Sequence, residues 1–83
     1  MTYTKLLKPT TTEAFGNMNG FFAIGTVSSA LLCTLWNPDE NDTTVRTFSI
    51  PSGFSASNGV VPLAVKQIDG TQAQLDKIVV VGI

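Results

Sequence analysis

The one cluster of residues that could bind a metal ion is acidic, and it comprises Asp39, Glu40, Asn41 and Asp42. Carboxylate and amide oxygens are the ligands that calcium prefers. A calcium loop of the EF-hand type also needs a glycine at its sixth position and a distal glutamate. Thr44 occupies that sixth position, and the next acidic residue is Asp69. The cluster therefore predicts a polar turn between two strands, not a metal site.

Candidate nucleophiles are present, but their usual partners are missing. Cys33 is the single cysteine, and the 83 residues include no histidine. A cysteine or serine nucleophile is normally activated by a neighbouring base, most often histidine. Cys33 lies in an apolar segment, so we expect a buried and unreactive thiol. The sequence predicts a protein that is not an enzyme, with no catalytic residues and no cofactor.

The composition favours assembly over nucleic-acid binding. Apolar residues make up 43% of the chain and charged residues 13%, which is about half the usual charged share. Five basic residues against six acidic ones give a net charge of −1, so we expect no nucleic-acid partner. A domain of this size without a disulfide or a metal is marginally stable. We therefore expect it to be stabilised by forming homo-oligomers or by docking on a larger body.

Five segments have the pattern of β-strands and are separated by turn residues. Residues 43–50, for example, alternate with a period of two, which favours a strand over a helix. The expected strands are 21–27, 31–36, 43–50, 60–68 and 77–83, with a short loop or helical turn at 71–76. These five segments, in a chain that we expect to have about six short strands with regular turns, predict an all-β fold. We expect residues 21–83 to form a single domain, a small antiparallel β-sandwich or barrel.

Residues 1–20 are predicted to form an extended N-terminal arm. They are polar and rich in threonine, and Pro9 disfavours a helix. Such an arm could add as a strand to a neighbouring subunit, or it could be an unattached tail. Large apolar side chains dominate protein interfaces, and the candidates for contact are Tyr3, Leu6, Leu7, Trp36, Phe54 and Ile83.

A membrane span is the competing interpretation of residues 14–38, which contain no charged residue. The dense apolar part, Phe21–Trp36, is sixteen residues long, whereas a spanning helix needs about 20. It is also interrupted by Gly25, Ser28 and Ser29. We therefore expect strands here and no membrane contact, and a small single-span phage membrane protein is the second alternative function.

The C-terminal segment combines three features in a fixed order. An apolar stretch with a proline, GVVPLAVKQI at 59–68, is followed by the turn Gly70-Thr71-Gln72-Ala73 and by the apolar ending IVVVGI at 78–83. Such an ending is expected to lie in a sheet or an interface, because free termini are usually polar. These features resemble the spike base proteins of tailed-phage and gene-transfer-agent heads, and the likeness extends over residues 20–83.

The resemblance implies a virion structural protein on the capsid surface, as a capsid decoration or as the base of a head spike or fibre. The expected partners are further copies of the chain, as a trimer or pentamer, and the major capsid protein or another virion protein. The first alternative is a carbohydrate- or receptor-binding β module that uses its loops. Exposure of Trp36 and Phe54 on adjoining loops would favour that alternative.

Overall fold

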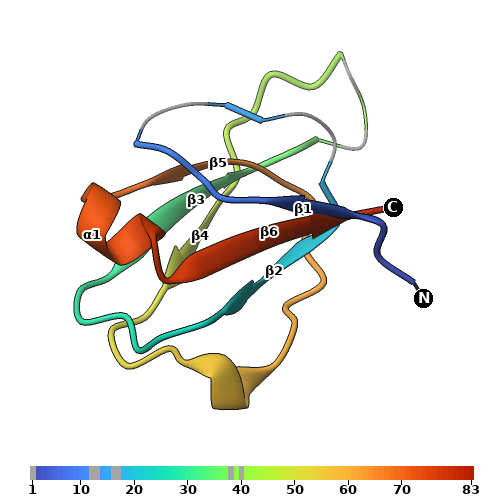
Figure 1. The fold of residues 1–83 in the computed structure, drawn as a ribbon. Coiled ribbons are helices and arrows are strands. Elements are labelled where there is room, and N and C mark those ends of the chain that lie inside the picture. The colour runs from blue at the N-terminus through green and yellow to red at the C-terminus, as the bar shows by residue number, and fades with distance from the viewer. Residues whose placement is uncertain (1, 12–13, 16–17, 38, 40) are drawn as a thin grey trace.

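The computed structural model describes residues 2–11, 14–15, 18–37, 39 and 41–83. Within these ranges the strands form two antiparallel sheets of three strands each (Figure 1). Sheet A has the order β1-β6-β2, and sheet B has the order β4-β3-β5. The strands are β1 Lys5–Leu7, β2 Gly20–Ala23, β3 Leu31–Leu35, β4 Thr47–Ile50, β5 Val65–Asp69 and β6 Ile78–Gly82. A 3₁₀ turn, η1 (Ala56–Asn58), and a short helix, α1 (Gln72–Leu75), complete the elements. The predicted all-β class is confirmed.

The predicted strand at residues 60–68 is divided between the two sheets. Val61 forms an isolated bridge with Phe21 of sheet A, with backbone N–H···O distances of 2.8 and 3.1 Å. The chain then crosses to sheet B, where β5 begins at Val65. Pro62 lies between the two pairings and has no N–H to donate, so a continuous strand would lack a hydrogen bond there.

The predicted strand at residues 43–50 begins four residues late, at Thr47. The residues before it belong to a loop that is held by side chains. Asn37 Nδ2 donates to the carbonyl oxygens of Asp42 and Thr44, both at 2.8 Å. Pro38 and Glu40 of the predicted polar turn lie outside the described residues, as do residues 1, 12–13 and 16–17 of the predicted arm.

The described part of the N-terminal segment lies against its own chain. In β1, Leu6 is opposite Val81 and Leu7 is opposite Val80, both in β6. Further along, Pro9 is fully buried, and its carbonyl oxygen accepts a hydrogen bond from Gln72 Nε2 at 3.3 Å. This segment supplies the strand that brings the number in the described residues to six.

The hydrophobic core lies between the inward faces of the two sheets. Three phenylalanines meet there: the ring centroid of Phe21 lies 6.3 Å from that of Phe48 and 5.8 Å from that of Phe54. Fully buried aliphatic side chains from both sheets and from α1 surround them: Leu31, Ile50, Val65, Ile68, Leu75, Ile78 and Val80. The core therefore uses one face of each sheet.

The uncharged segment that suggested a membrane span contains β2 and β3. Among the described residues, the structure has no helix with the length and apolar character needed to cross a membrane.

Candidate functional site

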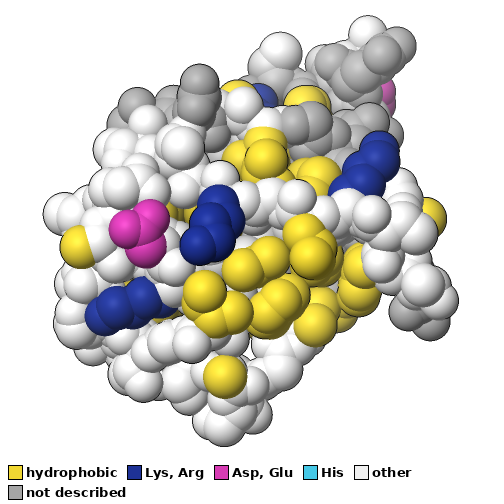
Figure 2. Space-filling model, in the orientation of Figure 1, with side chains coloured by type: hydrophobic (Ala, Val, Ile, Leu, Met, Phe, Trp, Pro, Cys, Tyr) yellow, Lys and Arg dark blue, Asp and Glu magenta, His cyan; other side chains and the backbone are white. Residues whose placement is uncertain are grey.

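The outer face of sheet A is apolar. Side chains alternate between the two faces of a strand, and in β2 and β6 the core takes Phe21, Ala23, Ile78 and Val80. The alternate positions point outward. They form two cross-strand rows: Leu6, Val81 and Gly20 in one, and Val79 and Phe22 in the other. Figure 2 shows apolar side chains gathered over these strands.

Two residues outside the strands extend this surface. Ile24 follows β2 and is 55% exposed, and Val60 is 43% exposed. We define the apolar face as Leu6, Phe22, Ile24, Val60, Val79 and Val81. None of these six side chains carries a charge, and basic side chains lie beside the patch (Figure 2).

Gly20 lets Val60 join the apolar face. A Cβ atom at Gly20 would lie 3.3 Å from Val60 Cγ1 and only 2.7 Å from the carbonyl oxygen of Val61. The space that a side chain would need at position 20 is therefore filled by the Val60 side chain and the Val61 backbone. In consequence the first row continues from Leu6 through Val81 to Val60.

The apolar face is hollowed at one side and raised at the other. A shallow hollow of about 450 Å³, here called the β2 hollow, is lined by Phe22, Ala23, Ile24, Ala56, Gly59 and Val60. On the opposite side of β6, Leu6 is 72% exposed on the edge strand β1. Between them, Val79 and Val81 lie low, at 8% and 2% exposure.

The outer face of sheet B has a different character. Its outward positions are mostly polar, and the register places Leu32 between Ser49 and Asp69, and Thr34 between Thr47 and Gln67. Gln67 Nε2 also donates to Asp69 Oδ1 at 2.9 Å. A surface of this kind is suited to contact with water, so the outer face of sheet A is the better candidate for contact with another protein.

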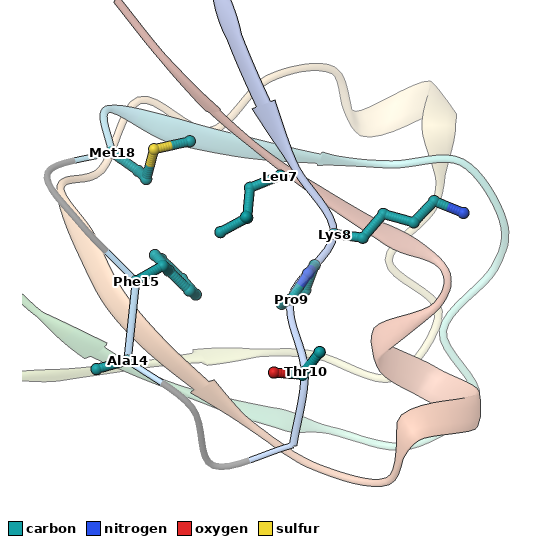
Figure 3. A pocket seen from close by; sticks show the side chains of 7 residues that line it. All are labelled: Leu7, Lys8, Pro9, Thr10, Ala14, Phe15 and Met18. Atoms are coloured by element: carbon teal, nitrogen blue, oxygen red, sulfur yellow. The ribbon is translucent and has the colours of Figure 1, made fainter.

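A second hollow, of about 370 Å³, lies beneath the N-terminal segment. Figure 3 shows the side chains of Leu7, Phe15 and Met18 directed into it and the Lys8 ammonium directed away. Pro9, Thr10 and Ala14 complete the lining. The hollow is mainly apolar, and none of the described residues that line it carries a carboxylate.

The predicted contact residues fall into three environments. Leu6, Leu7 and Ile83 are exposed at sheet A or next to it, at 72%, 37% and 55%, and Tyr3 is half-buried. Trp36 follows β3 of sheet B, is 37% exposed and has Lys66 Nζ 5.4 Å from its ring centroid. Phe54 is in the core, so it offers no ring to a ligand beside Trp36. Exposure of both rings, which would favour the loop-binding alternative, is therefore not what the structure has, since Trp36 is exposed and Phe54 is buried.

Sequence reasoning missed Phe22, Ile24 and Val60 as surface residues. Phe22 belongs to a segment in which almost every residue is apolar, so the pattern does not show which side chains point outward. A signal was available in Phe21 and Phe22 themselves, because adjacent residues of a strand must face opposite sides of the sheet. The position of Val60 depends on the long-range pairing of Val61 with Phe21.

The carboxylates of the predicted polar turn have partners within the loop. Asp42 Oδ1 accepts the Thr44 backbone N–H at 2.9 Å, and Asp42 Oδ2 forms a 2.8 Å ion pair with Arg46. These contacts, the Thr44 N–H foremost, lower the pKa of Asp42 to about 2. Asp39 Oδ1 accepts the Asn41 N–H at 2.9 Å. In the described ranges no three histidine, cysteine or acidic residues are grouped so that they could hold a metal ion.

Cys33 has the environment that the sequence predicts. Its side chain is fully buried in the core. Burial raises the pKa of the Cys33 thiol to about 12, and the negative charge of Asp69 adds to the effect. The thiol is therefore protonated and shielded at neutral pH, which makes it a packing residue.

The fold and this surface define a small all-β protein with one polar and one apolar outer sheet face. Comparison of the chain with protein-family models, with curated proteins and with solved structures gives no match.

Proposed function

We propose that this chain is a non-enzymatic structural protein of a tailed-phage-like particle, and that it acts by assembling with copies of itself on the capsid surface. The apolar face of sheet A is the observation that carries the proposal. Contiguous exposed apolar patches on small proteins usually mark contacts with other proteins. The particle setting is supported by the resemblance to spike base proteins, which extends over residues 20–83 and so includes β6, the central strand of sheet A.

The exposed side chains of the apolar face supply part of the free energy that self-association needs. The exposed fractions of Leu6, Ile24 and Val60 together exceed one and a half whole side chains. Burying them contributes about 3–5 kcal/mol per copy, at about 1.5–3 kcal/mol for each fully buried aliphatic side chain. Two copies contribute about twice that amount, which is comparable to the cost of association, about 4–15 kcal/mol. Association at micromolar concentration requires about 8 kcal/mol beyond that cost, and our proposal assigns this remainder to the rest of the face and its surroundings.

Sedimentation of the purified chain tests the assembly. Wild-type protein should sediment as an oligomer at micromolar concentration, and Leu6→Asp should shift it towards monomer. The matched control is Leu32→Asp, because Leu32 is 47% exposed on the outer face of sheet B. A wild-type monomer throughout the micromolar range, or equal effects of the two substitutions, contradicts self-assembly through sheet A.

The particle setting has its own test. Particles purified from a lysate of the source should contain the chain in a fixed ratio to the major capsid protein, as measured by quantitative mass spectrometry. Two results contradict a structural role on the capsid. One is loss of the wild-type chain from the particles during density-gradient washing, and the other is retention of Leu6→Asp equal to that of the wild type.

A further inference from the structure

We propose that the Asn58–Gly59 peptide is a site of spontaneous modification, at which Asn58 loses its amide nitrogen and becomes aspartate or isoaspartate. The backbone nitrogen of Gly59 attacks Cγ of Asn58, and a five-membered succinimide ring forms. The Cγ–Nδ2 bond breaks, and the nitrogen leaves as ammonia together with the proton of the Gly59 N–H. Water then opens the ring at either carbonyl, which gives aspartate or, with the backbone passing through the former side chain, isoaspartate.

The attacking nitrogen is weakly restrained. The Gly59 N–H donates to the Ala56 carbonyl oxygen at 3.2 Å, which is the long end of the usual range for such bonds. Gly59 has no side chain, and a Cβ atom built on it would meet nothing within 4 Å. Solvent can therefore reach the N–H proton that must be removed and the ring that water must open.

The amide group of Asn58 is polarised for this attack. Its Oδ1 accepts the Ser55 backbone N–H at 2.9 Å. A fixed donor at this oxygen stabilises the negative charge that develops on it when Cγ is attacked. Among the described residues, none forms a hydrogen bond with Nδ2 of Asn58. The leaving nitrogen is therefore not held in place.

Ring closure requires the backbone to rotate at Asn58, and the local structure resists this rotation little. Asn58 is the last residue of η1, a single 3₁₀ turn that contains no buried residue. Segments with few buried contacts open at a low cost in free energy. The geometry for attack is thus accessible without unfolding of the sheets.

The chain has a second Asn-Gly pair, Asn19–Gly20, and the fold protects it. The Asn19 N–H donates to the Val81 carbonyl oxygen at 2.8 Å, and Asn19 Oδ1 accepts the Ile83 N–H at 3.0 Å. Gly20 is buried at the start of β2. Loss of the two hydrogen bonds alone should slow the reaction at Asn19 by about tenfold or more. The structure therefore selects one of two identical sequence pairs.

The modification would also alter the apolar face, a consequence that rests on the proposed function. Ala56 and Gly59 line the β2 hollow, and the new carboxylate at position 58 lies between them in the chain. Isoaspartate also adds one carbon to the backbone just before Val60, which belongs to the apolar face. The reaction should therefore weaken assembly through sheet A as the protein ages.

Peptide mapping tests the modification. The folded chain is incubated at mildly alkaline pH and digested with trypsin at mildly acidic pH, and the peptide masses are followed over time. Trypsin cleaves after Arg46 and Lys66, and peptide 47–66 has Asn58 as its only side-chain amide. This peptide should gain one mass unit at a rate about tenfold or more above that of the peptide with Asn19. In urea the two rates should be similar, because the protection of Asn19 depends on the fold.

The matched variant for this measurement is Asn58→Gln. Glutamine would have to close a larger ring, so the variant should lose the mass gain in peptide 47–66, and labelling of that peptide by an isoaspartyl methyltransferase should be lost with it. Equal rates at the two Asn-Gly pairs of the folded chain overturn the modification site. A mass gain in peptide 47–66 that occurs only in urea overturns it as well.

Sedimentation tests the consequence for assembly. Asn58→Asp should shift the oligomer towards monomer, and the matched control is Asn41→Asp, which adds the same charge in the loop before β4 of sheet B. Equal effects of the two substitutions overturn the consequence and leave the modification site standing. A wild-type monomer contradicts the proposed function and the consequence together, whereas the peptide masses decide the modification independently.

Discussion

Phe54 should stabilise the folded chain as a core residue, although it lies between a turn and a 3₁₀ turn. Its side chain is 7% exposed, and its ring centroid lies 5.8 Å from that of Phe21. Two backbone hydrogen bonds clamp its segment to Val27: the Val27 N–H donates to the Phe54 carbonyl at 2.8 Å, and the Gly53 N–H donates to the Val27 carbonyl at 2.7 Å. The segment is therefore not free to collapse into the space left by a smaller side chain.

We expect Phe54→Ala to lower the free energy of unfolding by about 3–5 kcal/mol, the usual cost of this substitution in a core. The total for an 83-residue domain is about 4–12 kcal/mol, at about 0.05–0.15 kcal/mol per residue. The variant should thus lose a large share of its stability. Phe54→Leu, which keeps most of the volume, should lose about 1–2 kcal/mol.

Urea unfolding followed by circular dichroism measures these changes at one fixed protein concentration, because association also contributes to stability. With an m value of about 1–1.5 kcal/mol/M, the midpoint of Phe54→Ala should fall by about 2 M or more. Trp36→Ala is the matched control, since the Trp36 ring is 37% exposed and its loss should shift the midpoint less. A loss below about 1 kcal/mol for Phe54→Ala, or a larger effect at Trp36, refutes the core assignment.

Three further predictions concern backbone packing and ionisation. Gly20→Ala should lower the free energy of unfolding by about 1–2 kcal/mol and speed hydrogen exchange of the Val61 amide. The reason is that the new Cβ would lie 2.7 Å from the Val61 carbonyl oxygen and disrupt the two hydrogen bonds between Val61 and Phe21. Gly25→Ala is the matched control and should cost less, since the nearest neighbour of its new Cβ is Lys77 Cγ at 3.4 Å. Cys33 should react with a thiol reagent only after unfolding, and rapid labelling of the native protein would contradict its burial. The free energy of unfolding should fall above about pH 9, because the unfolded thiol ionises at its ordinary pKa while the folded thiol, whose pKa is raised to about 12, stays protonated. Cys33→Ala should remove this part of the pH dependence. The Asp42 carboxyl should titrate at a pKa of about 2 instead of 3.8. Its contribution to stability is therefore present above about pH 4 and is lost as the pH falls towards 2. An NMR titration with a midpoint near the ordinary value, or a midpoint that Arg46→Ala leaves unchanged, argues against the loop contacts.

The success of the strand predictions depends on local rules. The predicted strands at 31–36 and 77–83 differ by at most one residue at either end from β3 and β6, because turn residues bound both segments. The strand predicted at 60–68 is wrong as a single element, since Val61 pairs in sheet A and Val65 begins a strand of sheet B. The alternation of apolar and polar side chains within residues 60–68 does not indicate which strand each half of the segment will pair with.

The candidate site was predicted only in part. Leu6 was named as a contact residue because it is a large apolar side chain in a polar segment, and it is the most exposed member of the apolar face. Phe54 was named for its Gly- and Ser-rich surroundings, which describe the loop but not where the ring points. The two backbone hydrogen bonds to Val27 direct the Phe54 ring into the core. A contact between residues so far apart in the chain does not appear in the local sequence pattern.

The amino-acid sequence alone determined the all-β class, most of the turns and the inert character of Cys33, because period-two patterns, turn chemistry and the lack of a histidine are local or compositional properties. Only the tertiary structure decided which face of sheet A is outside. Val79, Val80 and Val81 are equally apolar, so the pattern of β6 is the same for either face. Pairing with β1 and β2 places Val80 in the core and leaves Val79 and Val81, which are 8% and 2% exposed, on the same side of sheet A as Leu6 and Phe22, the side that we propose for assembly.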